Sequence, residues 1–398
     1  MRVDPAHLTY CTNVHPGETW AEIAAQIVRH VPAVKARVAP HQRFGIGLRM
    51  SETAVADLRP HGAALAEFKA WLREAGLYVF TINGFPQGAF HGQRVKDAVY
   101  RPDWRDPRRL VYTNALARLL ADLLEDEPAT LEGSISTVPG GYKAHLAGNA
   151  GAAGIIAETL LNHAATLVGL ARETGRTITL ALEPEPGCLL ETISEAVAFF
   201  EGHLFSTPAV SRFAERMGLN RAAAEEALRR HLGLCLDACH LAVAYDDPGK
   251  ALDRLAGAGI RIAKAQLSAG LHVPCADAAA RAALKPYAEG IYLHQVSARR
   301  ANNSLARFAD LPDALADADQ GAEWRIHVHV PIWAERCGFF HSTRDVLAAL
   351  LKRQRERPFT NHLEVETYTW DVLPAEARGD SLTDSLAREL TWALQHLR

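Results

Sequence analysis

Three carboxylates at or near the ends of short apolar runs are the first candidates for chemistry in this sequence. Glu183 and Asp237 each close such a run, and Glu366 lies near the end of another. Alternate side chains of an extended strand share one face, so Glu364 and Glu366 point the same way, with Glu366 nearer the strand's end. Burial of a carboxylate is costly unless it meets a cation or hydrogen-bond donors. These positions therefore indicate a metal site, with a salt bridge as the alternative for Glu183.

A polar series in a further run adds two candidates. Lys264, Gln266 and Ser268 alternate with small or apolar residues. The amide oxygen of Gln266 is a weaker ligand than a carboxylate but is acceptable to Mg²⁺ or Mn²⁺. Lys264 can orient an anionic or hydroxyl-bearing substrate. A buried hydrogen-bond network without metal explains Gln266 almost as well.

Histidines supply the nitrogen donors. His240 follows Asp237 by three residues, so the two can share a metal, or His240 can contact substrate or cap the next helix. His327 and His329 are spaced to project from one face of a strand, a recurrent metal-binding pattern, and His294 in a neighbouring run can join them. We expect His329 to bind metal and the other three histidines to contact substrate.

Carboxylate and amide oxygens with an imidazole favour Mn²⁺, Mg²⁺ or Co²⁺, and Zn²⁺ also fits. Such an ion can bind two adjacent oxygens of a polyol or hydroxyketone and acidify the proton between them. Glu183 and Glu366 are then the expected base and acid. Trp370, just after the last run, is expected to form an aromatic wall over the substrate.

Eight short apolar runs alternate with helical segments, which predicts an α/β fold, a (β/α)8 barrel with the candidate residues at the carboxyl ends of its strands. The runs cover residues 7–13, 44–50, 77–85, 131–138, 177–183, 232–237, 261–268 and 362–368. Two more runs, 291–296 and 324–330, predict a β-hairpin insertion within about residues 271–335. Alternatively, one of them is the true seventh or eighth strand. No change in composition marks a boundary, so we expect a single domain over residues 1–398.

Composition narrows the class of partner. The net charge of −3 gives no reason to expect binding to nucleic acid or to an anionic membrane. The six cysteines form no CxxC pair, which is typical of free thiols in a reducing compartment. No signal pattern is visible at the N-terminus, and the small-residue stretch 146–171 is expected to be a packed helix. We therefore expect a cytoplasmic protein, compatible with a homo-oligomer, that acts on a small molecule.

These residues resemble the xylose isomerase-like barrels, which include sugar isomerases, epimerases and endonuclease IV. Members have Glu after the fifth strand, Asp with a nearby His after the sixth, a polar ligand on the seventh and Glu on the eighth. The matching positions are Glu183, Asp237 with His240, Gln266 and Glu366. Many epimerases have His on the seventh strand, so Gln266 is a departure that leaves the metal's identity open.

More narrowly, the chain resembles the family named metabolite traffic protein EboE. The resemblance implies a sugar-isomerase-like fold and a role in making or exporting a small secondary metabolite. The segments that carry it are HLTYCTNVHPGETW (7–20), VYRPDW (99–104), LALEPEPG (180–187), YLHQV (292–296), RIHVHVPIW (325–333) and HLEVETYTWDVLP (362–374).

Two hypotheses of different classes follow. The first is a metal-dependent isomerase, epimerase or related lyase acting on a sugar-like or cyclitol-like molecule. The second is a non-catalytic carrier that holds a pathway intermediate in the same pocket. Phosphodiester hydrolysis fits less well because the chain is acidic, and amidohydrolase chemistry fits less well because HVH comes late in the chain.

Overall fold

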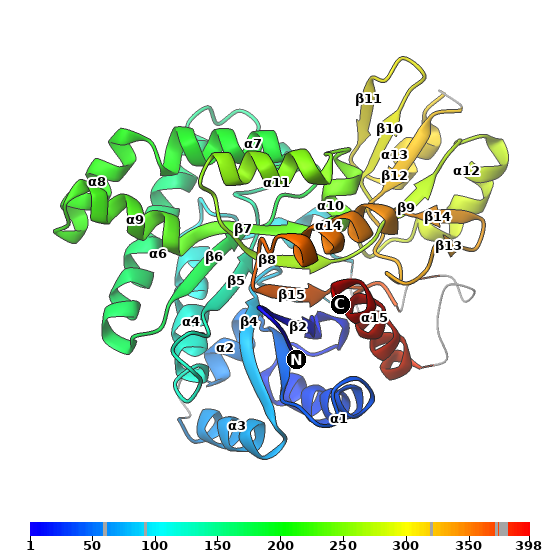
Figure 1. Ribbon diagram of the computed structural model, residues 1–398. Coiled ribbons are helices and arrows are strands. Elements are labelled where there is room, and N and C mark those ends of the chain that lie inside the picture. Colours follow the sequence, from blue (N-terminus) through cyan, green and yellow to red (C-terminus); the bar gives the residue numbers. More distant parts are fainter. Residues whose placement is uncertain (59–61, 91–93, 319–320, 371–372, 374–380) are drawn as a thin grey trace.

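Eight parallel strands close into a barrel in the computed structural model (Figure 1). Their ladder runs β2-β15-β8-β7-β6-β5-β4-β3, and a bridge between Cys11 and Gly47 joins the two ends. The structure describes residues 1–58, 62–90, 94–318, 321–370, 373 and 381–398. The predicted barrel is confirmed, with strands β2 (Ala6–Tyr10), β3 (Phe44–Arg49), β4 (Leu77–Asn83), β5 (Gly133–Thr137), β6 (Ile178–Leu182), β7 (Leu232–Asp237), β8 (Ile262–Leu267) and β15 (His362–Val365). A short strand, β1 (Arg2–Val3), pairs antiparallel with β2.

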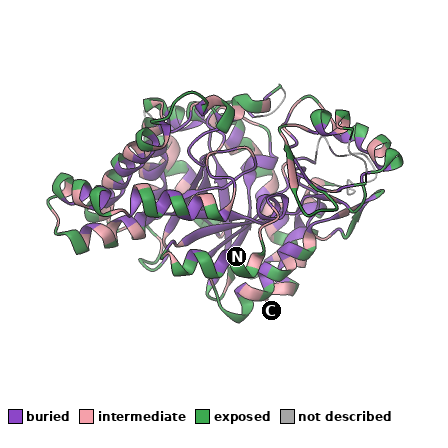
Figure 2. Ribbon diagram, turned by 90° about the horizontal axis from the view of Figure 1, so that it is seen from above, coloured by how far each residue is buried: buried purple, intermediate pink, exposed green. Residues whose placement is uncertain are grey.

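Helices cover the outside of the barrel, and their outward faces are exposed while the strands are buried (Figure 2). Helix α1 (Trp20–Val38) shows the cause: its buried residues recur every three or four positions, and Thr19 and Glu22 form a capping box at its start. The other covering helices are α2 (Glu52–Leu58), α3 (Gly62–Glu74), α4 (Pro107–Leu123), α6 (Ala152–Thr174), α7 (Ile193–Phe199), α8 (Thr207–Met217), α9 (Arg221–His231), α11 (Pro248–Gly257), α14 (Arg344–Glu356) and α15 (Leu382–Leu397). Helix α10 (Ala238–Val243), directly after β7, is buried along its whole length.

Helix α6 corresponds to the small-residue stretch of the sequence. By length and composition it could cross a membrane, but half of its most apolar window is buried inside the structure. It packs against α4 and α9, as expected for a packed helix.

The insertion between β8 and β15 is larger than the predicted hairpin. It forms a six-stranded sheet in the order β11-β10-β12-β9-β14-β13, beside the barrel in yellow and orange in Figure 1. Its strands are β9 (Leu271–Val273), β10 (Val296–Arg299), β11 (Leu305–Phe308), β12 (Glu323–Ile326), β13 (Arg336–Cys337) and β14 (Phe340–Ser342), and its helices are α12 (Ala278–Leu284) and α13 (Leu311–Ala316).

The two predicted insertion strands do pair, but over different residues. Val296 lies opposite Ile326 in the β10–β12 ladder. Strand β10 begins where the predicted run ends, and β12 stops four residues before its run does. The placement of His294, His327 and His329 on strands was therefore wrong: all three lie in irregular backbone next to the strand ends.

Inside the barrel, Lys264 forms an ion pair in the core, whereas we expected it to orient a substrate. Its Nζ lies 2.5 Å from Oε2 of Glu364, and both side chains are fully buried. Burial alone would lower the pKa of Lys264, but Glu364 raises it above its usual value. Gly47 makes room for this pair, because a Cβ at that position would lie 1.6 Å from Glu364 Oε1. Lys264 thus neutralises a core carboxylate, and it does not line the cavity at the carboxyl end of the barrel, which is described below.

This ion pair makes a testable prediction about stability. In Lys264→Met, Glu364 would remain buried without its cation, and we expect the free energy of unfolding to fall by about 3–5 kcal/mol. The double variant Lys264→Met/Glu364→Gln should recover a large part of that loss, because it removes the isolated charge as well. Urea unfolding of the three proteins measures both effects. Equal stability of the wild type and Lys264→Met would contradict this role.

Candidate metal centre

Three carboxylates meet at the carboxyl end of the barrel. Glu183 follows β6 directly, Asp237 is the last residue of β7, and Glu366 follows β15 directly. One oxygen of each lies within 4.8 Å of the others, and all three residues are buried. Parallel strands end at the same edge, which is why residues so distant in sequence converge.

Burial and mutual repulsion disfavour the ionised forms of these carboxyl groups. Burial first, then Glu366 and Asp237, raise the pKa of Glu183 well above its usual value. Burial and then Asp237 raise the pKa of Glu366 in the same way. Among the described residues, no lysine or arginine forms an ion pair with any of the three carboxylates. A divalent cation bound among them would supply that positive charge.

Hydrogen bonds fix the orientation of the Asp237 and Glu366 carboxylates. The backbone N–H of His240 and the hydroxyl of Ser268 both donate to Asp237 Oδ1, each at 2.8 Å. Asp237 Oδ2 is buried and accepts no hydrogen bond from the part of the chain described. The side chains of Asn13 and Asn83 donate to Glu366 Oε1 at 2.8 and 3.0 Å. Each carboxylate thus has one anchored oxygen and one left for a further partner.

His329 is oriented as a metal-binding histidine would be. Its Nδ1 lies 2.7 Å from the backbone oxygen of Glu366. That oxygen can only accept, so Nδ1 carries the proton and Nε2 bears the lone pair. Nε2 is buried and has no hydrogen-bond partner among the residues described. Burial lowers the pKa of His329 to about 4, which keeps the ring neutral. His329, His240 and Asp237 form a second group of donors within 4.8 Å.

Gln266 lies between Asp237 and Glu364 in the barrel ladder. It is fully buried, and neither atom of its amide forms a hydrogen bond within the described chain. An orphaned buried amide is costly, so Gln266 fits a ligand position as predicted from the sequence. Its role as a ligand remains a prediction.

The three histidines expected to contact substrate divide into two groups. His240 and His327 line a cavity above the carboxylates, and their Nε2 atoms are 3.1 Å apart. His240 does not cap a helix, because Asp237 is the N-cap of α10. His294 does not reach the cavity: Glu289 holds its Nε2 at 2.9 Å, and the backbone oxygen of His327 holds its Nδ1 at 3.1 Å. We expected His294 to contact substrate, but its side chain instead holds the backbone of the segment that carries His327.

Trp370 is also displaced from its expected role. It is buried but does not line the cavity. The aromatic wall comes instead from residues distant from one another in the sequence, around a small cavity of about 60 Å³. Its aromatic lining residues are Phe85, Phe90, Tyr100, Tyr292 and Tyr368.

Four polar groups of this site were not among the expected site residues. Asn13 and Asn83 lie at the ends of the first and third predicted runs, so the strand-end rule that selected Glu183 could have found them. Glu185 lies two residues after Glu183, and its Oε1 accepts a hydrogen bond from the hydroxyl of Tyr100 at 2.7 Å. No local pattern in the sequence marks Tyr100, which is the last residue of a short 3-10 helix, Lys96–Tyr100.

Known structures share this architecture. A xylose isomerase-like TIM barrel protein from Mycobacterium smegmatis, in complex with magnesium, is 12% identical, with 100% of this chain and 98% of that chain covered and a TM-score of 0.51. The chain has the xylose isomerase-like TIM barrel fold. The IOLI protein with a bound zinc atom is 11% identical, with 98% of both chains covered and a TM-score of 0.46. The 3-keto-D-glucoside 4-epimerase YcjR from E. coli is 11% identical, with 98% of both chains covered and a TM-score of 0.44. No protein-family description and no curated protein matches the sequence.

The last helix ties together the two loops that carry Glu366 and His329. Glu389 of α15 is fully buried, and its Oε1 accepts hydrogen bonds from Thr367 Oγ1 at 2.6 Å and from the backbone N–H of Ile332 at 3.2 Å. Burial raises the pKa of Glu389 from 4.5 to about 8. The folded protein therefore holds a proton here that the unfolded chain releases at lower pH.

We predict that Glu389→Gln changes how stability depends on pH. Between about pH 4.5 and pH 8, folding of the wild type takes up this proton, so its stability falls as the pH rises. The variant side chain is always neutral and lacks this slope. Relative to Glu389→Gln, the wild type should therefore lose stability from pH 5 to pH 8, by at most about 4 kcal/mol. Urea unfolding of both proteins across this pH range measures the difference. If the free energy of unfolding depends on pH in the same way in the wild type and in Glu389→Gln, Glu389 is ionised in the folded protein and the prediction is wrong.

Proposed function

We propose that this protein is a divalent-metal-dependent isomerase or epimerase for a sugar-like or cyclitol-like molecule. The observation that carries the proposal is the buried group Glu183, Asp237 and Glu366, which forms no ion pair with a lysine or arginine among the described residues and opens onto a cavity. The residues proposed to hold the ion are these three with His329, and Gln266 beside them. Mn²⁺, Mg²⁺, Co²⁺ and Zn²⁺ all fit this donor set.

The ion would supply Lewis acidity, making the proton beside a bound carbonyl or hydroxyl group easier to remove. The protein's part is to hold and move that proton. Glu183 and Glu366 line the cavity, whereas Asp237 does not. Two carboxylates on one substrate-facing wall can serve as base and acid, because a proton removed by one can be returned by the other. The aromatic lining would exclude water from the exchange.

The resemblance to the EboE family supports a place in the biosynthesis or export of a secondary metabolite. It also keeps a second candidate open, a carrier that binds a pathway intermediate without reacting. The observation that favours a carrier is Gln266, whose neutral amide is a weaker metal ligand than a carboxylate and stands where many epimerases have His.

Exchange of substrate protons with solvent separates the two functions. We expect the metal-loaded protein to exchange a carbon-bound proton of a ketose or keto-cyclitol in D₂O, as followed by ¹H NMR across a panel of such compounds. Glu183→Gln should reduce the rate at least 100-fold, because general acid–base catalysis contributes 10²–10⁴-fold.

The matched control is Glu132→Gln, at the opposite end of the barrel, where Glu132 pairs with Arg261. It should exchange like the wild type. Exchange by Glu183→Gln at the wild-type rate would refute the catalytic role. Binding of a panel compound without any exchange by the wild type would favour the carrier instead.

Metal binding is expected to stabilise the fold. Mn²⁺ at about 100 times its dissociation constant should add about 2.7 kcal/mol to the free energy of unfolding of the metal-free protein. Asp237→Asn should abolish this gain while keeping an oxygen that can accept from His240 and Ser268. Thermal unfolding with and without Mn²⁺ measures it, with exposed Asp253→Asn as the control. An equal gain in Asp237→Asn would place the ion elsewhere.

A further inference from the structure

The imidazoles of His240 and His327 face each other in an arrangement that the carboxylate site does not explain. Their Nε2 atoms are 3.1 Å apart, and the rings meet edge to face. His240 comes from the barrel, at the start of α10, whereas His327 comes from the insertion, just after β12. Two parts of the fold thus bring these nitrogens together.

The tautomers of both rings follow from their other nitrogens. Nδ1 of His240 lies 3.0 Å from the carbonyl oxygen of Pro184, which can only accept, so Nδ1 carries the proton. Nδ1 of His327 lies 2.8 Å from Oε1 of Gln295. In each neutral ring Nε2 therefore bears a lone pair.

The orientation of the Gln295 amide is itself fixed. Its Nε2 donates to the carbonyl oxygen of Pro186 at 3.1 Å and to the hydroxyl of Tyr100 at 2.7 Å. A flipped amide would set two oxygens against each other at Pro186. The oxygen of Gln295 must therefore face His327, which confirms Nδ1 as the protonated nitrogen of that ring.

Two lone pairs that face each other at 3.1 Å repel unless a cation lies between them. Nitrogens that bind one metal ion at 2.0–2.1 Å in tetrahedral geometry lie about 3.3 Å apart, close to the observed distance. A carboxylate completes the set: Glu185 has a donor atom within 4.8 Å of both histidines. Its Oε2 is buried and has no hydrogen-bond partner in the described parts of the chain.

We propose that His240, His327 and Glu185 form a second metal site, next to the carboxylate group and selective for a zinc-like ion; His240 Nε2 lies 3.9 Å from Asp237 Oδ1, so the two sites adjoin. Two imidazoles and one carboxylate are a donor set that Zn²⁺ takes with a fourth position open. All three residues line the cavity, so a substrate oxygen or a water molecule can occupy that position. The site adds to the proposed function a second ion in the same cavity.

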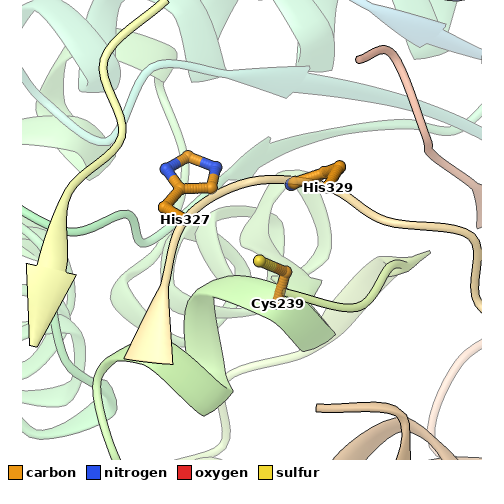
Figure 3. A group of neighbouring side chains, drawn as sticks. All are labelled: Cys239, His327 and His329. Atoms are coloured by element: carbon orange, nitrogen blue, oxygen red, sulfur yellow. The ribbon is translucent and has the colours of Figure 1, made fainter. Parts of the chain in front are cut away.

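A competing donor set lies next to it. The sulfur of Cys239 points from α10 toward the segment that carries His327 and His329 (Figure 3), and the three residues have donor atoms within 4.8 Å of one another. Cys239 and His329 do not line the cavity. Nε2 of His329 belongs with Asp237 in the first site. Glu185 is therefore the better third ligand for His327.

Counting bound ions tests this site. Metal-free protein is loaded with Zn²⁺ or Co²⁺, freed of excess ion and analysed by elemental analysis, with the absorption bands of Co²⁺ as a second readout. The wild type should hold two ions per chain. His327→Asn and Glu185→Gln should each hold one, with circular dichroism showing that they are folded. Cys239→Ala and His341→Asn, a histidine of β14, should hold two.

The outcomes separate this site from the first one. If the wild type holds one ion, lost in Asp237→Asn but kept in His327→Asn and Glu185→Gln, the second site is refuted and the proposed function stands. In that case a shared proton joins the two imidazoles. If Cys239→Ala loses an ion and Glu185→Gln does not, the assignment of ligands is wrong. If Asp237→Asn keeps both ions while His327→Asn loses one, the second site stands and the carboxylate site fails.

Discussion

Negative charge buried at the carboxyl end of the barrel is the constraint on which the rest of the site depends. One oxygen from each of Glu183, Asp237 and Glu366 lies within 4.8 Å of the others, so their negative charges repel one another unless a cation lies among them. The layer beneath shows a different solution, because there Lys264 neutralises Glu364 directly. In this lower layer of the barrel, a lysine of the chain itself provides the positive charge. One layer higher, no described lysine or arginine pairs with the three carboxylates, and in the proposed function a divalent ion neutralises them.

The insertion and the last helix position further side chains around these carboxylates from outside the barrel. The segment after β12 brings His329 to Asp237 and His327 to His240. Gln295 and the backbone of Glu366 fix the rings, and Glu389 holds the loops behind them. Donors that are oriented before an ion arrives lose little freedom when it binds. A large insertion at this end therefore acts on the chemistry as well as on access to it.

Much of the barrel and its carboxylates could be predicted from the sequence because both depend on local rules. Alternation selects the inward face, and parallel strands end together, so Glu183, Asp237 and Glu366 were found without knowing any contact. How deep a residue lies along the barrel axis depends on strand register, which no local sequence rule gives. Lys264 does point inward as expected, but its partner on β15 depends on strand register, which the sequence does not display.

The insertion was harder to predict for the same reason. The HxH spacing drew attention to His327 and His329, whose rings do lie 5.3 Å apart, but both residues come after the end of β12, where the backbone is irregular. Trp370 was chosen because it is near Glu366 in sequence, whereas Tyr368 lines the cavity. Tyr100 and Tyr292 come from segments whose paths are set by tertiary packing, and no periodic pattern identifies such residues.

Anomalous diffraction from crystals soaked in Mn²⁺ tests the central claim most directly. The account predicts an anomalous peak bounded by Glu183, Asp237 and Glu366, with carboxylate oxygens at about 2.0–2.3 Å from the ion. Crystals at saturating Mn²⁺ that show no peak there, with the three carboxylates still close together, would contradict it. The buried charge would then be neutralised by protons, and the barrel would have no need of a metal.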